Sequence, residues 1–159
     1  DYRDETGTYD AVASIEMFEA VGERYWPRYF ETLHRVLRPG GRAVIQAITI
    51  AEDRFERYRS TSDFIQQYIF PGGMLATKSR IAGEAARAGL RLDGVHEFGL
   101  DYARTLETWL ERFDAAEPAV RQLGFPVRFV RMWRFYLAYC AAGFLSGTTN
   151  VGQYTLFRD

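Results

Sequence analysis

Two apolar stretches decide the fold, "YDAVASIEM" (residues 9–17) and "RAVIQAITI" (residues 42–50), together with the helix predicted between them. Each stretch is short and bounded by turn residues, which is typical of a buried strand. Pro27 suits the first turn of a helix. The "RPGG" at residues 38–41 is a helix stop. A strand, a helix and a second strand with short connections predict a parallel β-α-β unit.

The remaining residues predict an α/β domain with helical additions. A polar piece is expected at 52–62, a short helix at 63–69, a turn at 70–73, a helix at 78–88, a strand at 90–99, helices at 102–115 and 127–145, and a final strand at 151–159. This order indicates one domain with a doubly wound sheet and helical insertions at about 51–77 and 102–148. Dinucleotide-binding sheets carry a G-x-G-x-x-G turn after an early strand. The sequence has no such turn, so we expect the N-terminal strands and the glycine loop to be missing.

Composition limits the partners and the compartment. The 20 basic and 21 acidic residues give a net charge of -1, which offers no argument for nucleic acid. Cys140 is the only cysteine, so no disulfide forms within the chain and a reducing, cytoplasmic setting is favoured. The opening residues lack the pattern of a signal peptide. The longest apolar run, at 135–145, is too short to span a bilayer.

Glu19 follows the first predicted strand almost directly. Open α/β sheets bind ligands at the carboxyl ends of their strands, so an acid at this place is a candidate site residue. An ordinary acid that pairs with an arginine or caps a helix is the alternative, and position alone favours it. His34 and His96 form no metal or triad pattern, so we expect no metal site and a structural role for both.

Four motifs, which follow one another along the chain, favour a functional role for Glu19 over that of an ordinary acid. They are "MFEAVGERYWPRYF" (17–30), "RVLRPGGRAVIQAIT" (35–49), "YIFPGGMLAT" (68–77) and "HEFGLDYARTLETWLERF" (96–113). Together they resemble the cyclopropane-fatty-acyl-phospholipid synthase family, whose members are longer than this chain. The resemblance implies a Rossmann-like class I methyltransferase fold, of which these residues form the C-terminal portion of a single catalytic domain. It also implies that this portion alone is inactive.

The resemblance further implies the chemistry. Such enzymes use S-adenosylmethionine to transfer a methyl or methylene carbon to the cis double bond of unsaturated acyl chains in phospholipids. The product is a cyclopropane, or a methylene- or methyl-branched chain, and bound bicarbonate serves as the base. The family's catalytic positions fall on Glu19, on Gln46, on the backbone of Ile48 and on Tyr102. Many members carry His where Gln46 stands, so the product is in doubt.

The same resemblance implies the cofactor contacts. Tyr2 and Arg3 fall beside the adenine, and Ile15 lines that pocket. A frayed chain end is the alternative for the first two residues.

The residues that would contact the lipid substrate are indicated less specifically by the sequence. Aromatic and methionine side chains are candidates for an acyl tunnel, although ordinary core positions explain them as well: Tyr68, Phe70, Met74, Trp133, Tyr136 and Phe144. A basic stretch fits a peripheral membrane surface or a solvated helix face: Arg121, Arg128, Arg131 and Arg134. A homodimer is compatible with the sequence. Two other functions stay open, which are a methyltransferase of the same fold acting on a soluble small molecule and a non-catalytic lipid-binding module.

Overall fold

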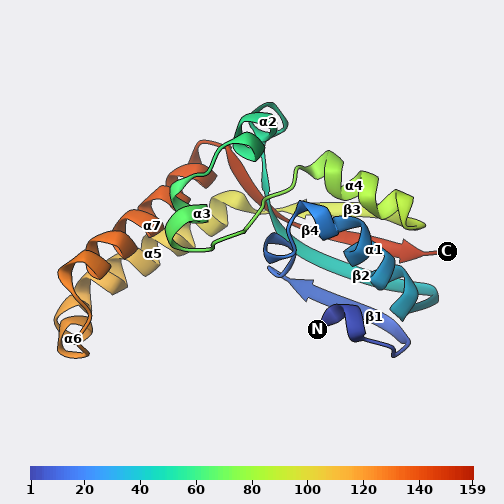
Figure 1. The fold of residues 1–159 in the computed structure, drawn as a ribbon, viewed down its shortest axis with the longest axis horizontal. Coiled ribbons are helices and arrows are strands. Elements are labelled where there is room, and N and C mark those ends of the chain that lie inside the picture. The colour runs from blue at the N-terminus through green and yellow to red at the C-terminus, as the bar shows by residue number, and fades with distance from the viewer. The chain divides into compact units, whose positions relative to one another are not determined.

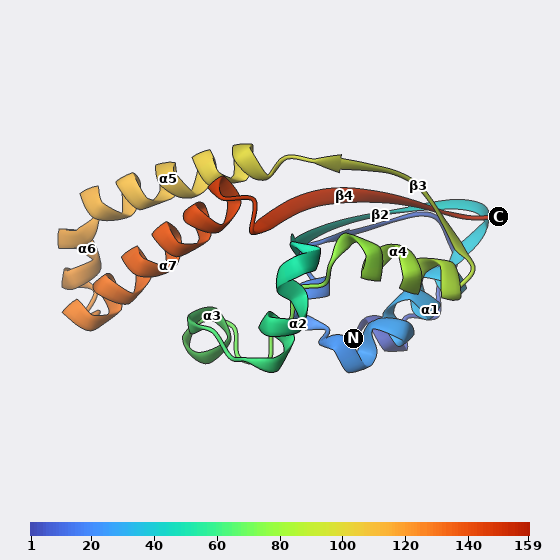
Figure 2. The same cartoon turned by 90° about the horizontal axis from the view of Figure 1, so that it is seen from above.

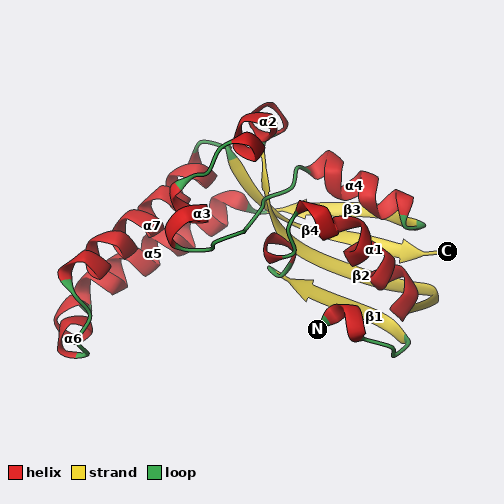
Figure 3. Cartoon of the chain, in the orientation of Figure 1, coloured by secondary structure: helices red, strands yellow, loops and turns green.

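The computed structural model describes residues 1–159. The chain forms two compact units (Figure 1). The first contains residues 1–97 and 151–159 and is built on a sheet. The second contains residues 98–150 and is helical, as the colouring in Figure 3 shows. We call them the sheet unit and the helical unit and describe each by itself.

The sheet has four strands in the order β1-β2-β4-β3. These are β1 (Tyr9–Ile15), β2 (Leu37–Ile50), β3 (Leu90–Glu97) and β4 (Thr149–Arg158). β1 and β2 are parallel and joined through α1 (Trp26–Val36), which confirms the predicted β-α-β unit. β3 and β4 are antiparallel. β2 already begins at Leu37, so the "RPGG" stretch that ends the helix also belongs to the strand.

Helices of this unit lie on one face of the sheet. Figure 2 shows α1 and α4 (Lys78–Arg87) on the same side of the strands. β2 reflects this arrangement, because Ala43, Ile45 and Ala47 are buried while the alternate residues between them are half-buried. In the described residues the helices of the sheet unit therefore cover one face, and the doubly wound arrangement, with helices on both faces, stays a prediction. The α/β class itself is confirmed.

An aromatic cluster fixes the connection between β1 and α1. Phe18 lies 5.5 Å from Trp26, 5.0 Å from Tyr29 and 5.5 Å from Phe30, measured between ring centroids. All four side chains are fully buried. Burying each ring stabilises the fold by about 1.5–3 kcal/mol, so the short 3-10 turn at Phe18–Ala20 is anchored in the core.

The segment between β2 and α4 contains two helices, α2 (Glu52–Ser60) and α3 (Phe64–Tyr68). The sequence predicted only the second. α3 begins with a capping box in which Asp63 and Gln66 satisfy each other's backbone N–H groups. α2 is mostly charged and buries only Phe55, so its sequence lacks the apolar stripe by which helices are recognised.

The helical unit consists of α5 (Gly99–Ala115), α6 (Glu117–Gln122) and α7 (Val127–Leu145). α7 runs back along α5 (Figure 1). Small and branched side chains are buried in this unit: Ala103, Leu106, Val130, Leu137 and Ala141. The sequence did not predict α6, which has a proline in its first turn. Each helix is either too short or too polar to span a lipid bilayer.

Candidate active site

Glu19 lies in the 3-10 turn after β1 and is tied to the neighbouring strand. Its Oε1 accepts a hydrogen bond from the backbone N–H of Ile48, at 2.6 Å. Its Oε2 is buried and has no partner. The backbone carbonyl of Glu19 accepts a second bond, from the N–H of Met74 at 2.9 Å. The carboxylate is thus held by one oxygen while the other stays available.

Burial raises the pKa of the Glu19 carboxyl above its ordinary value, and the negative charge of Glu16 raises it further. The hydrogen bond from Ile48 acts in the opposite direction. A desolvated carboxylate with an unused oxygen is costly for folding, because buried polar groups are normally paired. Such a group is more typical of a ligand site than of a structural ion pair.

Gln46 lies on β2, two residues before Ile48, and belongs to a row of polar side chains. Its amide nitrogen donates to Glu16 Oε1 at 2.8 Å, and its amide oxygen accepts from Gln153 at 3.1 Å. The amide nitrogen carries two hydrogens, so one remains after the bond to Glu16. Since Gln46 and Ile48 are two residues apart on one strand, they face the same side of the sheet.

Glu16 was not predicted as part of the site. It has a φ of 51°, a left-handed conformation that residues with a Cβ rarely adopt. Its backbone N–H donates to the carbonyl of Gln46 at 2.8 Å, which holds the end of β1 against β2. Backbone strain of this kind is concentrated at functional sites. The sequence signal was a second acid in the same short stretch, placed directly at the strand end.

A hydrogen bond thus joins two of the four predicted catalytic positions, Glu19 and Ile48, and Gln46 lies two residues before Ile48 on the same strand. Tyr102 lies in the helical unit, on α5. There its ring is half-buried and packs 5.0 Å from Phe144 and 6.5 Å from Phe98. The Ile48 N–H bonds to Glu19, so its visible role is to orient that carboxylate.

A cavity of about 250 Å³ lies beside the same 3-10 turn. Tyr2 and Arg3, two of the predicted cofactor residues, line it. Tyr2 packs edge-on against Tyr29, with 5.6 Å between ring centroids. Ile15 does not line the cavity, and its side chain is 69% exposed at the end of β1. The other lining residues are Asp1, Met17, Ala20, Val21 and Tyr25, which the sequence did not single out.

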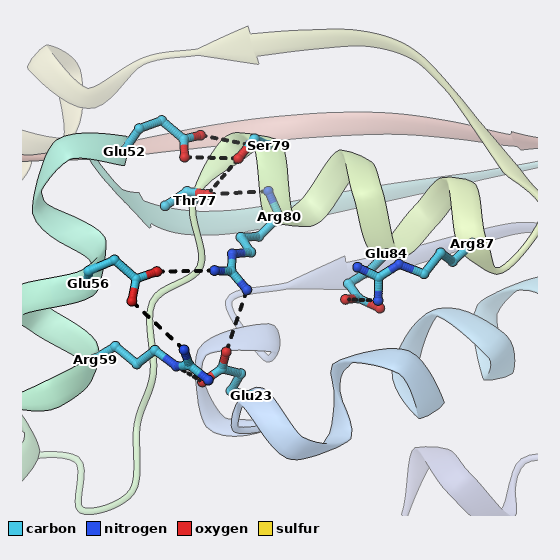
Figure 4. Close-up of polar contacts among 9 residues, drawn as sticks. All are labelled: Glu23, Glu52, Glu56, Arg59, Thr77, Ser79, Arg80, Glu84 and Arg87. Atoms are coloured by element: carbon cyan, nitrogen blue, oxygen red, sulfur yellow. Dashed lines mark hydrogen bonds and ion pairs between the residues drawn. The ribbon is translucent and has the colours of Figure 1, made fainter.

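An ion-pair network holds the far end of this turn segment (Figure 4). The Glu23 carboxylate forms ion pairs with the guanidinium groups of Arg59, at 2.7 Å, and Arg80, at 3.7 Å. Arg80 also pairs with Glu56 at 3.3 Å and lies 4.7 Å from the centre of the Phe55 ring. The network connects α2 and α4 to the segment that carries Glu19 and lines the cavity, so it positions that segment.

The residues considered for an acyl tunnel occupy different surroundings. Tyr68 and Phe70 are more than half exposed, whereas Met74 packs against the core of the sheet unit. Trp133 and Tyr136 are ring neighbours on α7, 5.3 Å apart. Phe144 is buried against Tyr102. Their tunnel role stays a prediction.

Comparison with known proteins identifies the family. The sequence matches the family model of mycolic acid cyclopropane synthetase over residues 1–154. The chain belongs to this family. Cyclopropane-fatty-acyl-phospholipid synthase of Escherichia coli is 34% identical over 99% of the chain, which confirms the resemblance drawn from the motifs. Tuberculostearic acid methyltransferase UfaA1 of Mycobacterium tuberculosis is 48% identical over 100% of the chain.

Solved structures agree with this family. The mycolic acid cyclopropane synthase CmaA1, complexed with SAH and CTAB, has a TM-score of 0.89 at 25% identity over 98% of the chain and 57% of its own length. Phosphoethanolamine N-methyltransferase 2 of Haemonchus contortus, with a TM-score of 0.75 at 16% identity, shows the shared fold. The chain spans 38% of UfaA1 and 40% of the E. coli synthase.

Proposed function

We propose that this chain forms the C-terminal part of an S-adenosylmethionine-dependent enzyme that alkylates the cis double bond of unsaturated fatty acyl chains in phospholipids. The observation that carries the proposal is the buried Glu19 carboxylate, which has one oxygen fixed by Ile48 and the other without a partner. Membership of the cyclopropane synthetase family supplies the reaction class. The names of relatives include both a cyclopropane synthase and a methyltransferase.

The reaction requires a nucleophile, an electrophile and a base. S-adenosylmethionine supplies the electrophilic methyl group. The alkene carbon forms a bond to that methyl, the bond from the methyl to sulfur breaks, and the lipid becomes a carbocation. Loss of a proton from the transferred methyl then closes a cyclopropane ring. Because an alkene is a weak nucleophile, the protein must position the reactants and exclude water.

The residues of the sheet unit fit the cofactor. The cavity of about 250 Å³ offers the Tyr2 ring and the Tyr25 ring beside apolar lining, which suits a purine. Arg3 also lines it, and its guanidinium can donate to ring nitrogens.

Glu19 fits bicarbonate as the base. A carboxylate accepts the hydrogen bond of the bicarbonate hydroxyl, and Oε2 of Glu19 is the buried acceptor that lacks a donor. The remaining N–H of Gln46 is a donor for the oxygens of an anion. Glu19 would thus orient the base, while Glu16 fixes the amide of Gln46. Tyr102 is proposed as a further donor from the helical unit.

The product depends on which proton leaves. Loss from the transferred methyl gives a cyclopropane, and loss from another carbon gives a branched chain. Gln46 cannot carry the positive charge that His carries at this position in many members. The 48% identity to a protein named as a methyltransferase favours the branched product as the second candidate.

Mass spectrometry of membrane lipids tests the proposal. Cells that express the whole protein should gain one CH₂ unit on unsaturated acyl chains, and hydrogenation of the extract separates a ring from a methylene branch. A methyltransferase for a soluble small molecule would leave the lipids unchanged. Unchanged lipids, with active protein shown to consume S-adenosylmethionine on another substrate, would contradict the proposal.

A further inference from the structure

The turn between α6 and α7 presents apolar side chains to solvent. Residues 121–128 are all exposed. Within them Leu123 is 77% exposed, Phe125 43% and Val127 52%. Single exposed apolar residues are normal on protein surfaces, whereas three within five positions form a patch that calls for an explanation. We call residues 121–128 the tip of the helical unit.

The tip has a defined shape. The side chain of Arg121 donates to the backbone carbonyl of Phe125 at 2.7 Å, which closes the turn. Gly124 has a φ of 92°, a backbone conformation that glycine adopts readily and residues with a Cβ rarely adopt. Phe125 stacks on Phe129 at 4.5 Å, and Phe129 stacks on Trp133 at 5.3 Å. The Phe125 ring is therefore ordered in advance, so little conformational entropy is lost when it binds.

From the tip to the end of α7 every charged side chain is an arginine. No aspartate or glutamate occurs between Pro118 and Arg158. Arg134 is neutralised by Asp114 at 2.5 Å and by Glu117 at 2.6 Å, both of which precede this stretch. Arg128 and Arg131 are exposed and have no acidic partner. Two arginines without an acidic partner thus lie on the first two turns of α7, Arg128 within the tip and Arg131 next to it.

We propose that the tip docks on an anionic lipid bilayer. Leu123, Phe125 and Val127 enter the boundary between head groups and acyl chains, and Arg128 and Arg131 lie against the phosphates. Apolar burial combined with attraction to anionic lipid is the general basis of interfacial binding. A patch of three side chains is far smaller than a stable protein–protein interface, which buries about 800 Å² per partner. This inference rests on the proposed function, since it explains how such an enzyme reaches a substrate held in a membrane.

Vesicle sedimentation of the whole protein tests the docking. The wild type should bind phosphatidylglycerol vesicles and bind phosphatidylcholine vesicles at least tenfold more weakly, at moderate salt. The double variant R128Q/R131Q should bind phosphatidylglycerol roughly 10-fold or more weakly, because each arginine near the surface contributes about fivefold. The double variant L123S/F125S should lose a similar factor through its apolar contacts.

A matched control changes the same net charge elsewhere. R28Q/R57Q alters exposed arginines on α1 and α2 of the sheet unit and should bind like the wild type. Wild-type binding by R128Q/R131Q, or equal loss in R28Q/R57Q, would overturn the proposal. So would a change of oligomeric state in L123S/F125S by analytical ultracentrifugation, because the tip would then be a contact between copies.

A second substrate form separates docking from catalysis. Methyl transfer to an unsaturated phospholipid dispersed in neutral detergent needs no bilayer, so both tip variants should keep their turnover there and lose it on phosphatidylglycerol vesicles. Absent transfer on both substrates with intact vesicle binding would refute the proposed function and leave the docking standing. Transfer by the tip variants on vesicles at the wild-type rate would refute the docking alone.

Discussion

The sheet unit and the helical unit differ in how their acidic and basic residues are distributed. In the sheet unit acids and arginines are interleaved, and Glu23 and Glu56 each form ion pairs with both Arg59 and Arg80. In the helical unit acids are confined to the residues before Pro118, after which only arginines follow as charged side chains up to Arg158. Paired charges hold backbone segments in place, whereas unpaired charges of one sign attract a partner. The comparison teaches that the sheet unit is built to hold a fixed site and the helical unit to present a surface.

Glu19→Gln gives the largest expected effect and tests whether the fixed site carries the chemistry. The amide keeps an oxygen for the Ile48 N–H but replaces the free acceptor Oε2 by a donor. Turnover of the whole protein on unsaturated phospholipid should fall by about 10²–10⁴-fold, the range for losing acid–base assistance. The measurement is transfer of labelled methyl to lipid.

Glu31→Gln is the control for this substitution, because Glu31 is an exposed acid on α1. It should leave turnover unchanged. Turnover of Glu19→Gln close to that of Glu31→Gln would remove Glu19 from the mechanism.

Tyr2→Ala tests whether cofactor binding belongs to the sheet unit. Removing the ring that lines the cavity should weaken S-adenosylmethionine binding about 10-fold, since aromatic contact is worth around 1 kcal/mol beyond area burial. Calorimetry of the whole protein measures this. Tyr2→Phe should bind normally, and so should Trp109→Ala, which removes an exposed ring of the helical unit. A larger loss of S-adenosylmethionine affinity in Trp109→Ala than in Tyr2→Ala would show that cofactor binding does not belong to the sheet unit.

Arg80→Gln tests the positioning network. Glu23 keeps Arg59, so the segment from Glu19 to Tyr25 should loosen without unfolding. We expect the KM for S-adenosylmethionine to rise about threefold while the free energy of unfolding changes by less than about 1 kcal/mol, as is usual for partly exposed pairs. Arg104→Gln, which breaks only a pair with Asp101 within α5, should change neither quantity. An unchanged KM in Arg80→Gln would show that the ion-pair network does not position the segment from Glu19 to Tyr25 for cofactor binding.

The smallest expected effect is on the pH dependence of stability. Burial raises the pKa of Glu19 above 4.5, so the folded state binds more protons than the unfolded state between those two pKa values. The free energy of unfolding therefore falls as the pH rises from 4.5 through the raised pKa of Glu19. At higher pH the lost contribution is not regained. Glu19→Gln should lack this decline in urea unfolding at a series of pH values. A parallel profile in both proteins would show that Glu19 is not desolvated.

The sequence predicted the elements whose apolar residues recur with a period and missed those whose residues do not. β1, α1 and β2 were recognised from short apolar runs and turn residues, whereas α2 was read as a polar piece because its residues are mostly charged. Placing Glu19 in the site depended on motif resemblance. Its bond to Ile48 joins residues 29 apart in sequence, and no local pattern specifies such a contact. The left-handed backbone of Glu16 is likewise imposed by pairing with β2 and not by its own preference.

The strand order has a consequence for synthesis on the ribosome. β4 is made after the other three strands of the described sheet, yet it lies between β2 and β3. β3 pairs with β4, and in the order of the sheet it has no other neighbour. Until residues 149–158 have emerged, a nascent chain therefore carries two open strand edges in the middle of its future sheet, the kind of surface that chaperones recognise and that pairs wrongly with other chains. A premature stop before residue 149 would leave that gap permanently open.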